Sequence, residues 1–144
     1  MSPEDIEHME TVLRHIQHVR ENCTLLGNRM IKNGEGDLGR ILIANGLIHD
    51  NSKLNGIEWL HLRTKGTPEF DVAAKQHILT NPHHPEYWGS ITEMPRIYIA
   101  EMVCDWASRS QEFGNDLREW IKESATKKFT FTLQSRIWKE IKEF

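Results

Sequence analysis

Apolar side chains recur every three or four positions over most of the chain, which is the spacing of one face of an α-helix. Ser2 followed by Pro3 is typical of a helix start, because serine caps the first turn and proline fits its first position. We expect this helix to reach the turn at residues 33–36. A second helix is expected from Asp37 to Asp50.

The rest of the chain also predicts helices separated by turns. A short helix is expected to follow Asn55, and a longer one to open at Pro68 and to end at Asn81. The remaining helical segments are residues 95–113, 116–125 and 133–144. Residues 129–132 favour an extended conformation but have no evident partner strand. With no repeat or linker, the sequence predicts one domain, residues 1–144, an all-α bundle of six or seven helices.

Composition excludes several classes of function. The 144 residues carry a net charge of −3, and no basic stripe indicates binding to a nucleic-acid duplex. The adjacent pair Lys127-Lys128 is explained by a solvated helix end. The longest apolar run is too short for a membrane span. Cys23 and Cys104 lie far apart without a paired motif, which favours two reduced core thiols and a cytoplasmic protein.

The most unusual feature is a histidine followed by an aspartate, His49-Asp50, at the end of the apolar run 41–48. Burial of an imidazole and a carboxylate needs compensation, and a metal ion supplies it because both groups are good ligands. A second concentration of polar groups lies at residues 83–89, where two histidines, a proline, an acid and two aromatic residues form a loop directly after Pro82. Such a loop is more often functional than a simple connector.

Other residues of ligand type are spread along the chain. A lone histidine on a helix usually lies at the surface or is satisfied in the core, so each of these residues alone indicates little. The ordered set is His15, His49, Asp50, His77, His83, His84 and Asp105.

This order resembles the HD superfamily of metal-dependent phosphohydrolases, whose signature is an early helical histidine, a central His-Asp pair, two later histidines and a final aspartate. The local likeness is greatest to the HD-GYP type, through Lys53 three positions after Asp50 and through an acid shortly after a double histidine. The Gly-Tyr-Pro triplet is absent, so cyclic dinucleotide hydrolysis is not implied. The stretches HHPEYW and EMVCDW also resemble a small bacterial and phage family of no settled activity.

The resemblance implies an HD-like fold and one or two divalent transition metal ions. His15, His49, Asp50 and Asp105 would hold one ion, and His77 with His83, His84 or both would hold a second, with Asp50 bridging. His15 matches the early histidine because Val19 follows it by four positions; His18 is the alternative. Ligands rich in imidazole suit Mn, Fe, Co, Ni or Zn better than Mg or Ca.

The implied activity is hydrolysis of a phosphoester, most readily a nucleotide or nucleoside monophosphate. Two divalent ions carry more charge than two carboxylates cancel, so the site would stay cationic and attract phosphate. Metal-activated hydroxide would attack phosphorus. Two residues are assigned catalytic roles beside Asp50: Lys53 as a phosphate contact or a surface lysine, and Glu58 as a general acid or base or a group behind the ligands.

Four further residues are expected near the metals. Glu86 and Glu101 would orient ligand imidazoles, and Tyr87 and Trp88 would wall the pocket or pack in the core. The other tryptophans are expected in the core or at an interface, and a homodimer is compatible with the sequence.

Two alternatives share the same ligands. Some HD-fold proteins hold two irons and activate O₂, and the ligands alone do not separate that chemistry from hydrolysis. A non-catalytic domain that retains metal for stability is the other alternative.

Overall fold

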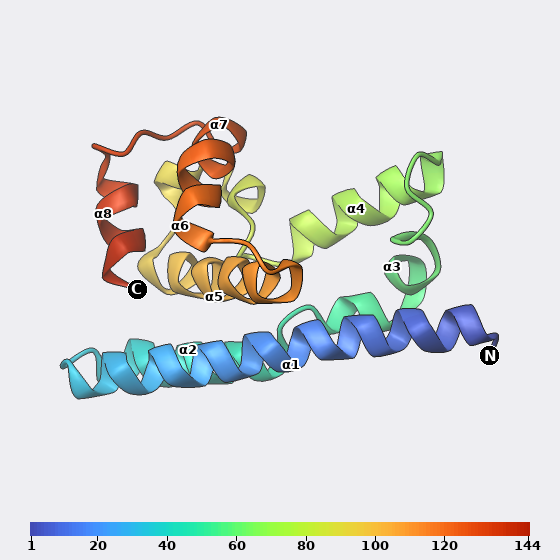
Figure 1. The fold of residues 1–144 in the computed structure, drawn as a ribbon, viewed down its shortest axis with the longest axis horizontal. Helices are drawn as coiled ribbons and strands as arrows, with labels where there is room; N and C mark the ends of the chain where they lie inside the picture. Colours follow the sequence, from blue (N-terminus) through green and yellow to red (C-terminus); the bar gives the residue numbers. More distant parts are fainter.

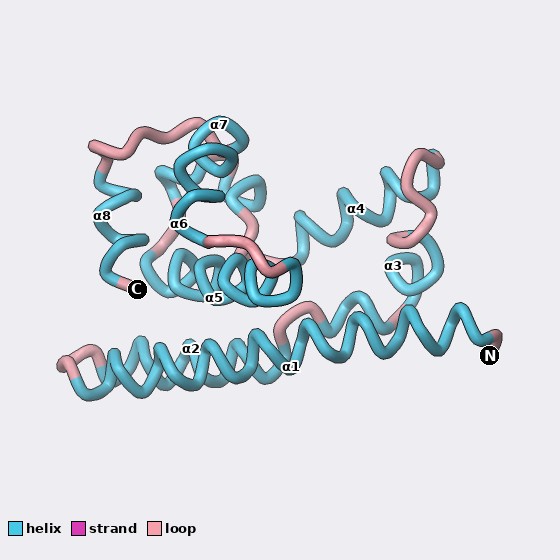
Figure 2. The backbone as a smooth tube through the Cα atoms, viewed as in Figure 1, coloured by secondary structure: helices cyan, strands magenta, loops and turns pink.

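The computed structural model describes residues 1–144, and it contains helices and loops but no strand (Figures 1 and 2). The helices are α1 (Pro3–Lys32), α2 (Gly36–Ile48), α3 (Gly56–His61), α4 (Pro68–Thr80), α5 (Arg96–Phe113), α6 (Leu117–Trp120), α7 (Thr126–Lys128) and α8 (Arg136–Glu143). Short 3₁₀ turns are η1 (Asn51–Leu54), η2 (Pro85–Trp88) and η3 (Ile91–Glu93), and η4 (Ile121–Ala125) is a π-helical turn. Because η4 joins α6 to α7 without a break, the chain forms seven helices, and the predicted all-α fold is confirmed.

The long helix α1 begins as the sequence predicted. The Ser2 side chain accepts a hydrogen bond from the Asp5 backbone, the Asp5 side chain accepts one from the Ser2 backbone, and Pro3 occupies the first turn. Both ends of this capping box satisfy backbone groups that a helix terminus otherwise leaves free. The helix ends at Lys32, and residues 33–35 turn the chain back into α2.

Helices α1 and α2 form an antiparallel hairpin that packs unusually closely (Figure 1). Gly46 makes this contact possible, since a Cβ atom built there would lie 2.6 Å from Cys23 Cβ. Helix α5 lies along the hairpin, antiparallel to α1, and a buried core fills the space between the three helices. It consists of Val19, Cys23, Leu26, Met30, Leu42, Ala100 and Cys104.

The C-terminal segment covers a different side of α5 and creates a second core (Figure 1). Its buried residues include Ile99, Met102, Trp106, Ile137 and Trp138. Residues 129–132 are not extended as expected, because Thr130 adopts a left-handed conformation with φ of 55° and Phe131 turns into this core. Helix α5 is therefore enclosed by apolar packing from both ends of the chain.

Helices α3 and α4 lie over the N-terminal half of α1 (Figure 1). Pro68 opens α4 and Asn81-Pro82 ends it, as the sequence predicted, and the Thr67 side chain caps its first turn. The chain then forms a loop at residues 83–88, which includes η2 and places His83 against α5. The C-terminal ends of α2 and α4 therefore lie beside the middle of α1 and α5. None of the helices is long and apolar enough to cross a membrane.

Candidate metal centre

The His49-Asp50 pair lies where helix α2 stops. His49 is the C-terminal cap of that helix, and Asp50 follows in the left-handed conformation with φ of 54° and ψ of 19°. A residue with a Cβ atom adopts this conformation at a penalty of about 1–2 kcal/mol. The reversal lets two neighbouring side chains point into the same space, and each residue is only 2% exposed.

The two oxygens of Asp50 face two different pairs of imidazoles. Oδ1 lies 3.4 Å from His77 Nε2 and 3.3 Å from His83 Nε2. Oδ2 lies 3.5 Å from His49 Nε2 and 4.0 Å from His15 Nε2. Most of these separations exceed a normal hydrogen bond, so the atoms converge on common points without bonding to one another. Asp50 thus lies between two sets of possible ligands.

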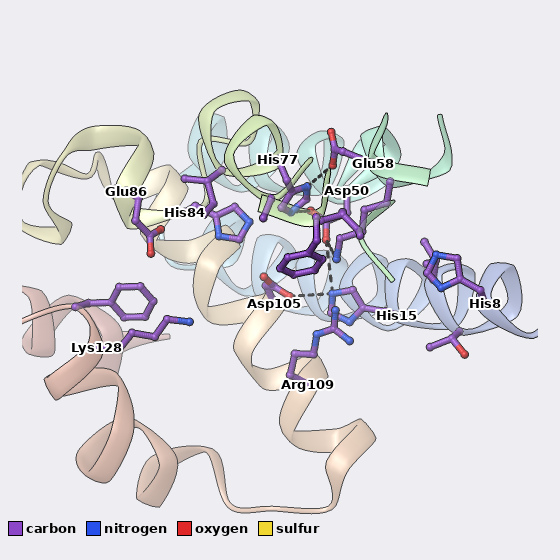
Figure 3. Close-up of a pocket in the computed structure, with 18 residues that line it drawn as sticks. His8, His15, Asp50, Glu58, His77, His84, Glu86, Asp105, Arg109 and Lys128 are labelled. Atoms are coloured by element: carbon purple, nitrogen blue, oxygen red, sulfur yellow. Dashed lines mark hydrogen bonds and ion pairs between the residues drawn. The ribbon is translucent and has the colours of Figure 1, made fainter. Parts of the chain in front are cut away.

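Asp105, on α5, completes the arrangement (Figure 3). Its Oδ1 lies 2.9 Å from His15 Nε2 and 3.8 Å from His49 Nε2, and its Oδ2 lies 3.6 Å from His83 Nε2. Three groups of side chains have ligand atoms within 4.8 Å of one another: Asp50 with His77, His83 and His84; His15 with His49 and Asp105; and His49 with His83 and Glu101. These groups are compatible with a metal site.

Glu101 lies behind two of the histidines. Its Oε1 accepts a hydrogen bond from His49 Nδ1 at 3.0 Å and lies 3.3 Å from His83 Nδ1, while its Oε2 accepts one from Asn45. A donating Nδ1 leaves Nε2 without a proton in the neutral ring. Glu101 thereby fixes the tautomer that a metal ligand needs.

Two more glutamates repeat this arrangement. Glu58 Oε1 accepts from His77 Nδ1 at 2.6 Å, and Glu112 Oε1 accepts from His15 Nδ1 at 2.8 Å. Glu58 is fully buried and also accepts from the Ser52 hydroxyl. This contact with a possible ligand fits the orienting role that the sequence allowed for Glu58, and Glu58 also lines the cavity beside the cluster. Glutamates therefore lie behind all four of the histidines that face Asp50.

Several buried polar atoms in this cluster have no hydrogen-bond partner. They are Asp50 Oδ1 and the Nε2 atoms of His15, His49, His83 and His84. The short separation of His15 Nε2 from Asp105 lacks hydrogen-bond alignment and so leaves that nitrogen unsatisfied. Unpaired buried groups are rare and unfavourable in proteins. These five atoms are divided between the ligand groups on the two sides of Asp50, and they fit one or two divalent ions that bind them.

The charges of the metal-free cluster are strongly coupled. Burial alone would raise the pKa of Asp50, but His49, Lys53 and His83 outweigh it and hold that pKa well below its usual range. Burial alone would lower the pKa of His49, yet the carboxylates of Asp50, Asp105 and Glu101 raise it to about 10. Without metal, His49 is therefore protonated and Asp50 is ionised at neutral pH.

His84 is in the opposite electrostatic state. Burial, with the nearby rings of His83 and His77, lowers its pKa to about 3. Burial also lowers the pKa of His77. Both rings are thus neutral at physiological pH, which is the form that binds a metal.

A cavity of about 430 Å³ opens beside the cluster. It lies between the helices that carry His15 on α1, His77 on α4 and Asp105 on α5 (Figure 3). Cationic side chains reach it from three elements. Lys53, whose Nζ is 2.9 Å from Asp50 Oδ2, lines the inner wall, and Arg109 and Lys128 line the outer part. The volume falls within the range of about 300–1,000 Å³ usual for small-molecule sites.

The structure brings together all the residues that the sequence proposed as ligands, together with Lys53, Glu58 and Glu101. Glu86 lines the cavity but contacts no imidazole, which contradicts the orienting role expected for it. Neither Tyr87 nor Trp88 lines this cavity. Tyr87 is exposed, and Trp88 packs against the second core and donates its indole N–H to the Pro82 carbonyl.

Sequence reasoning missed three residues around the site. Glu112 orients His15 and also accepts from His18 Nδ1 at 3.1 Å, so His18 lies behind the cluster and is not among its ligands. A signal was present in the spacing of Glu112, seven residues after Asp105 on the same helix face. Arg109 shares this face, whereas Lys128 comes from a distant segment and had no local signal.

The chain is all-α, and its buried imidazoles and carboxylates lie close enough together to be compatible with a metal site. A family model described as a family of unknown function, DUF5662, matches residues 4–144, and the chain belongs to this family. No curated protein and no solved structure matches the chain.

Proposed function

We propose that this protein is a metal-dependent phosphohydrolase that acts on a nucleotide or nucleoside monophosphate. The single observation that carries the proposal is the convergence of unsatisfied Nε2 atoms on Asp50, with a glutamate behind each facing ring. Without a cation, five buried polar atoms of this cluster lack a hydrogen-bond partner, which is unfavourable. The carboxylate–histidine pairs are those that tune metal ligands.

The ligand atoms favour one or two transition metal ions. His15, His49 and Asp105 would hold the first, with Asp50 Oδ2, and His77, His83 and His84 would hold the second, with Asp50 Oδ1. Imidazole ligands select Mn, Fe, Co, Ni or Zn over Mg or Ca. Such ions, when bound, lower the pKa of water enough to supply hydroxide near neutral pH.

The protein's own side chains would bind and orient the phosphoester. Lys53 lines the cavity while its Nζ contacts Asp50, so its charge lies beside any phosphate at the cluster. Arg109 and Lys128 add positive charge at the outer wall, which favours an anionic substrate over a neutral one. Glu58 would keep the His77 ring in place.

Location and assembly remain predictions. Cys23 and Cys104 are both free and buried, as expected for a protein of the reducing cytoplasm. The exposed apolar residues Ile41 and Ile48 on α2 are compatible with a homodimer.

The test measures metals and activity in the same preparation. We expect at least one transition metal per chain and turnover of nucleoside monophosphates with Mn²⁺, Co²⁺ or Ni²⁺. Asp50→Ala should abolish both, whereas Glu10→Gln, a change at an exposed residue on α1, should change neither. Less than one metal per chain, with activity unchanged in Asp50→Ala, would refute the proposal. Iron-dependent O₂ uptake without phosphoester turnover would indicate the oxygenase instead.

A further inference from the structure

A second cavity, of about 250 Å³, adjoins the one that contains the metal cluster. The two cavities share a wall formed by His84, Asp105, Arg109, Lys128 and Phe129. The far side of the second cavity is formed by the end of α5 and by α6. A molecule bound at the metal cluster can therefore extend past Arg109 and Lys128 into this space.

The second cavity is rich in aromatic side chains. Trp106 lies between Phe129, which stacks on it at 5.6 Å with an angle of 15°, and Trp120, which meets it edge-on at 5.2 Å. Phe113 lines the same space, yet it is 73% exposed and stacks on no other ring. An exposed phenyl ring beside an aromatic wall offers a face to a planar ligand.

Two polar side chains face the same cavity without a hydrogen-bond partner in the protein. Ser110 is buried and Asn115 lies just beyond the helix, and both line the second cavity. A hydroxyl and an amide can donate to and accept from the edge of a heteroaromatic ring. Aromatic faces with a few polar groups are typical of sites for small planar ligands.

The shared wall carries the positive charge. Arg109 is held by Glu112, with 3.2 Å between Nη1 and Oε2, while Lys128 forms no ion pair. Figure 3 shows Lys128 entering from the C-terminal segment and pointing toward Asp105. The Lys128 ammonium lies 5.3 Å from the centre of the Phe129 ring and has no carboxylate partner, so it is placed to contact a phosphate oxygen.

We propose that the second cavity binds the base of a nucleoside phosphate whose phosphate lies at the metal cluster. Phe113 stacks on the base, Ser110 and Asn115 bind its edge, and Lys128 contacts the phosphate side. This inference rests on the proposed function and names the part of the chain that selects the substrate. All four of these residues follow Asp105, the last residue of the pattern that resembles HD proteins.

The test uses the full-length protein with Mn²⁺ and measures equilibrium binding by tryptophan fluorescence. The probes are the four common ribonucleosides, their hydrolysis-resistant 5′-phosphonates and glycerol 3-phosphate. Phe113→Ala should weaken the binding of nucleosides and phosphonates about tenfold and leave the binding of glycerol 3-phosphate unchanged. Lys128→Met should weaken the binding of the phosphonates about fivefold and leave the binding of nucleosides unchanged. Lys127→Met is the matched control, because Lys127 lines neither cavity.

The outcomes separate this inference from the proposed function. Failure of every nucleoside to bind, or nucleoside binding unchanged in Phe113→Ala, would overturn the base pocket even if phosphoesters were hydrolysed. Nucleoside binding that depends on Phe113, with no phosphoester turnover under any metal, would support the pocket and refute only the hydrolase. Equal effects of Lys127→Met and Lys128→Met would overturn the role of Lys128.

Discussion

The most informative single substitution is Glu101→Gln. Glu101 is 6% exposed, and its two oxygens serve His49, His83 and Asn45. Glutamine has nearly the same shape and retains an oxygen for the imidazoles, and the Asn45 amide can reverse to match the new NH₂ group. The substitution therefore removes the negative charge behind two ligands without opening a cavity.

The size of the effect follows from the charge that is removed. Burial opposes ionisation of Glu101, but hydrogen bonds from His49 and His83 lower its pKa from 4.5 to about 2. That pKa difference corresponds to about 3 kcal/mol of interaction between the Glu101 carboxylate and its partners. It is an upper bound on the loss in metal binding, because part of it depends on the positive charge of His49, which this ring gives up when it binds a metal. Loss of a carboxylate behind a ligand weakens metal binding by about 10- to 100-fold.

Thermal unfolding with and without metal measures the loss. At a free metal concentration 100 times the wild-type Kd, metal stabilises the folded protein by about 2.7 kcal/mol, and a 10- to 100-fold weaker variant retains about 1.4 to 0.4 kcal/mol. At about 3 °C per kcal/mol, the metal-induced rise in Tm falls from about 8 °C to about 1–4 °C. Glu10→Gln is the control. Metal affinity within twofold of wild type in a folded Glu101→Gln protein would refute the reasoning.

Three further results are expected. In the metal-free protein His49 is protonated below a pKa of about 10, so metal binding at pH 7 should release a proton, and metal affinity should rise with pH. Titration calorimetry in buffers of different ionisation enthalpy measures both quantities. Metal binding without proton release would contradict the assignment of His49 as a ligand. Gly46→Ala should destabilise the protein by about 1–3 kcal/mol in urea unfolding, because its Cβ would overlap Cys23. Glu86→Gln should leave metal affinity unchanged, unlike Glu101→Gln, because Glu86 contacts no imidazole.

The helices were predictable because their signals are local. Ser2 and Pro3 start α1, Pro68 starts α4, and Asn81-Pro82 ends it, as capping and proline geometry require. The ligand set was proposed from order along the chain, since histidines and aspartates at family positions need no knowledge of packing. Local sequence did not specify the left-handed Asp50 that makes two neighbouring side chains converge.

Contacts between distant segments were the part that sequence could not supply. Glu112 and His15 are 97 positions apart, and only the packing of α5 along α1 brings them together. Lys128 was assigned to a solvated helix end, because nothing near it indicates that the C-terminal segment folds back to the cavity. The aromatic residues of the 83–89 loop were expected at the pocket, but Trp88 gains more by packing in the second core.

Helix α5 explains why the site and the fold depend on each other. Glu101, Asp105, Ser108 and Glu112 recur at intervals of four, three and four, so they form one stripe along the helix. Three carboxylates in a mostly buried stripe repel one another and lose their hydration, and apolar contacts compensate neither cost. Glu112 and Glu101 instead meet the Nδ1 atoms of His15 on α1 and His49 at the end of α2, so the Nε2 atoms of those rings are directed toward Asp50. Asp105 lies on the other side of the rings and faces their Nε2 atoms and that of His83. The histidines thus provide hydrogen bonds to Glu101 and Glu112, and their free Nε2 atoms, together with Asp50 and Asp105, remain available to a cation.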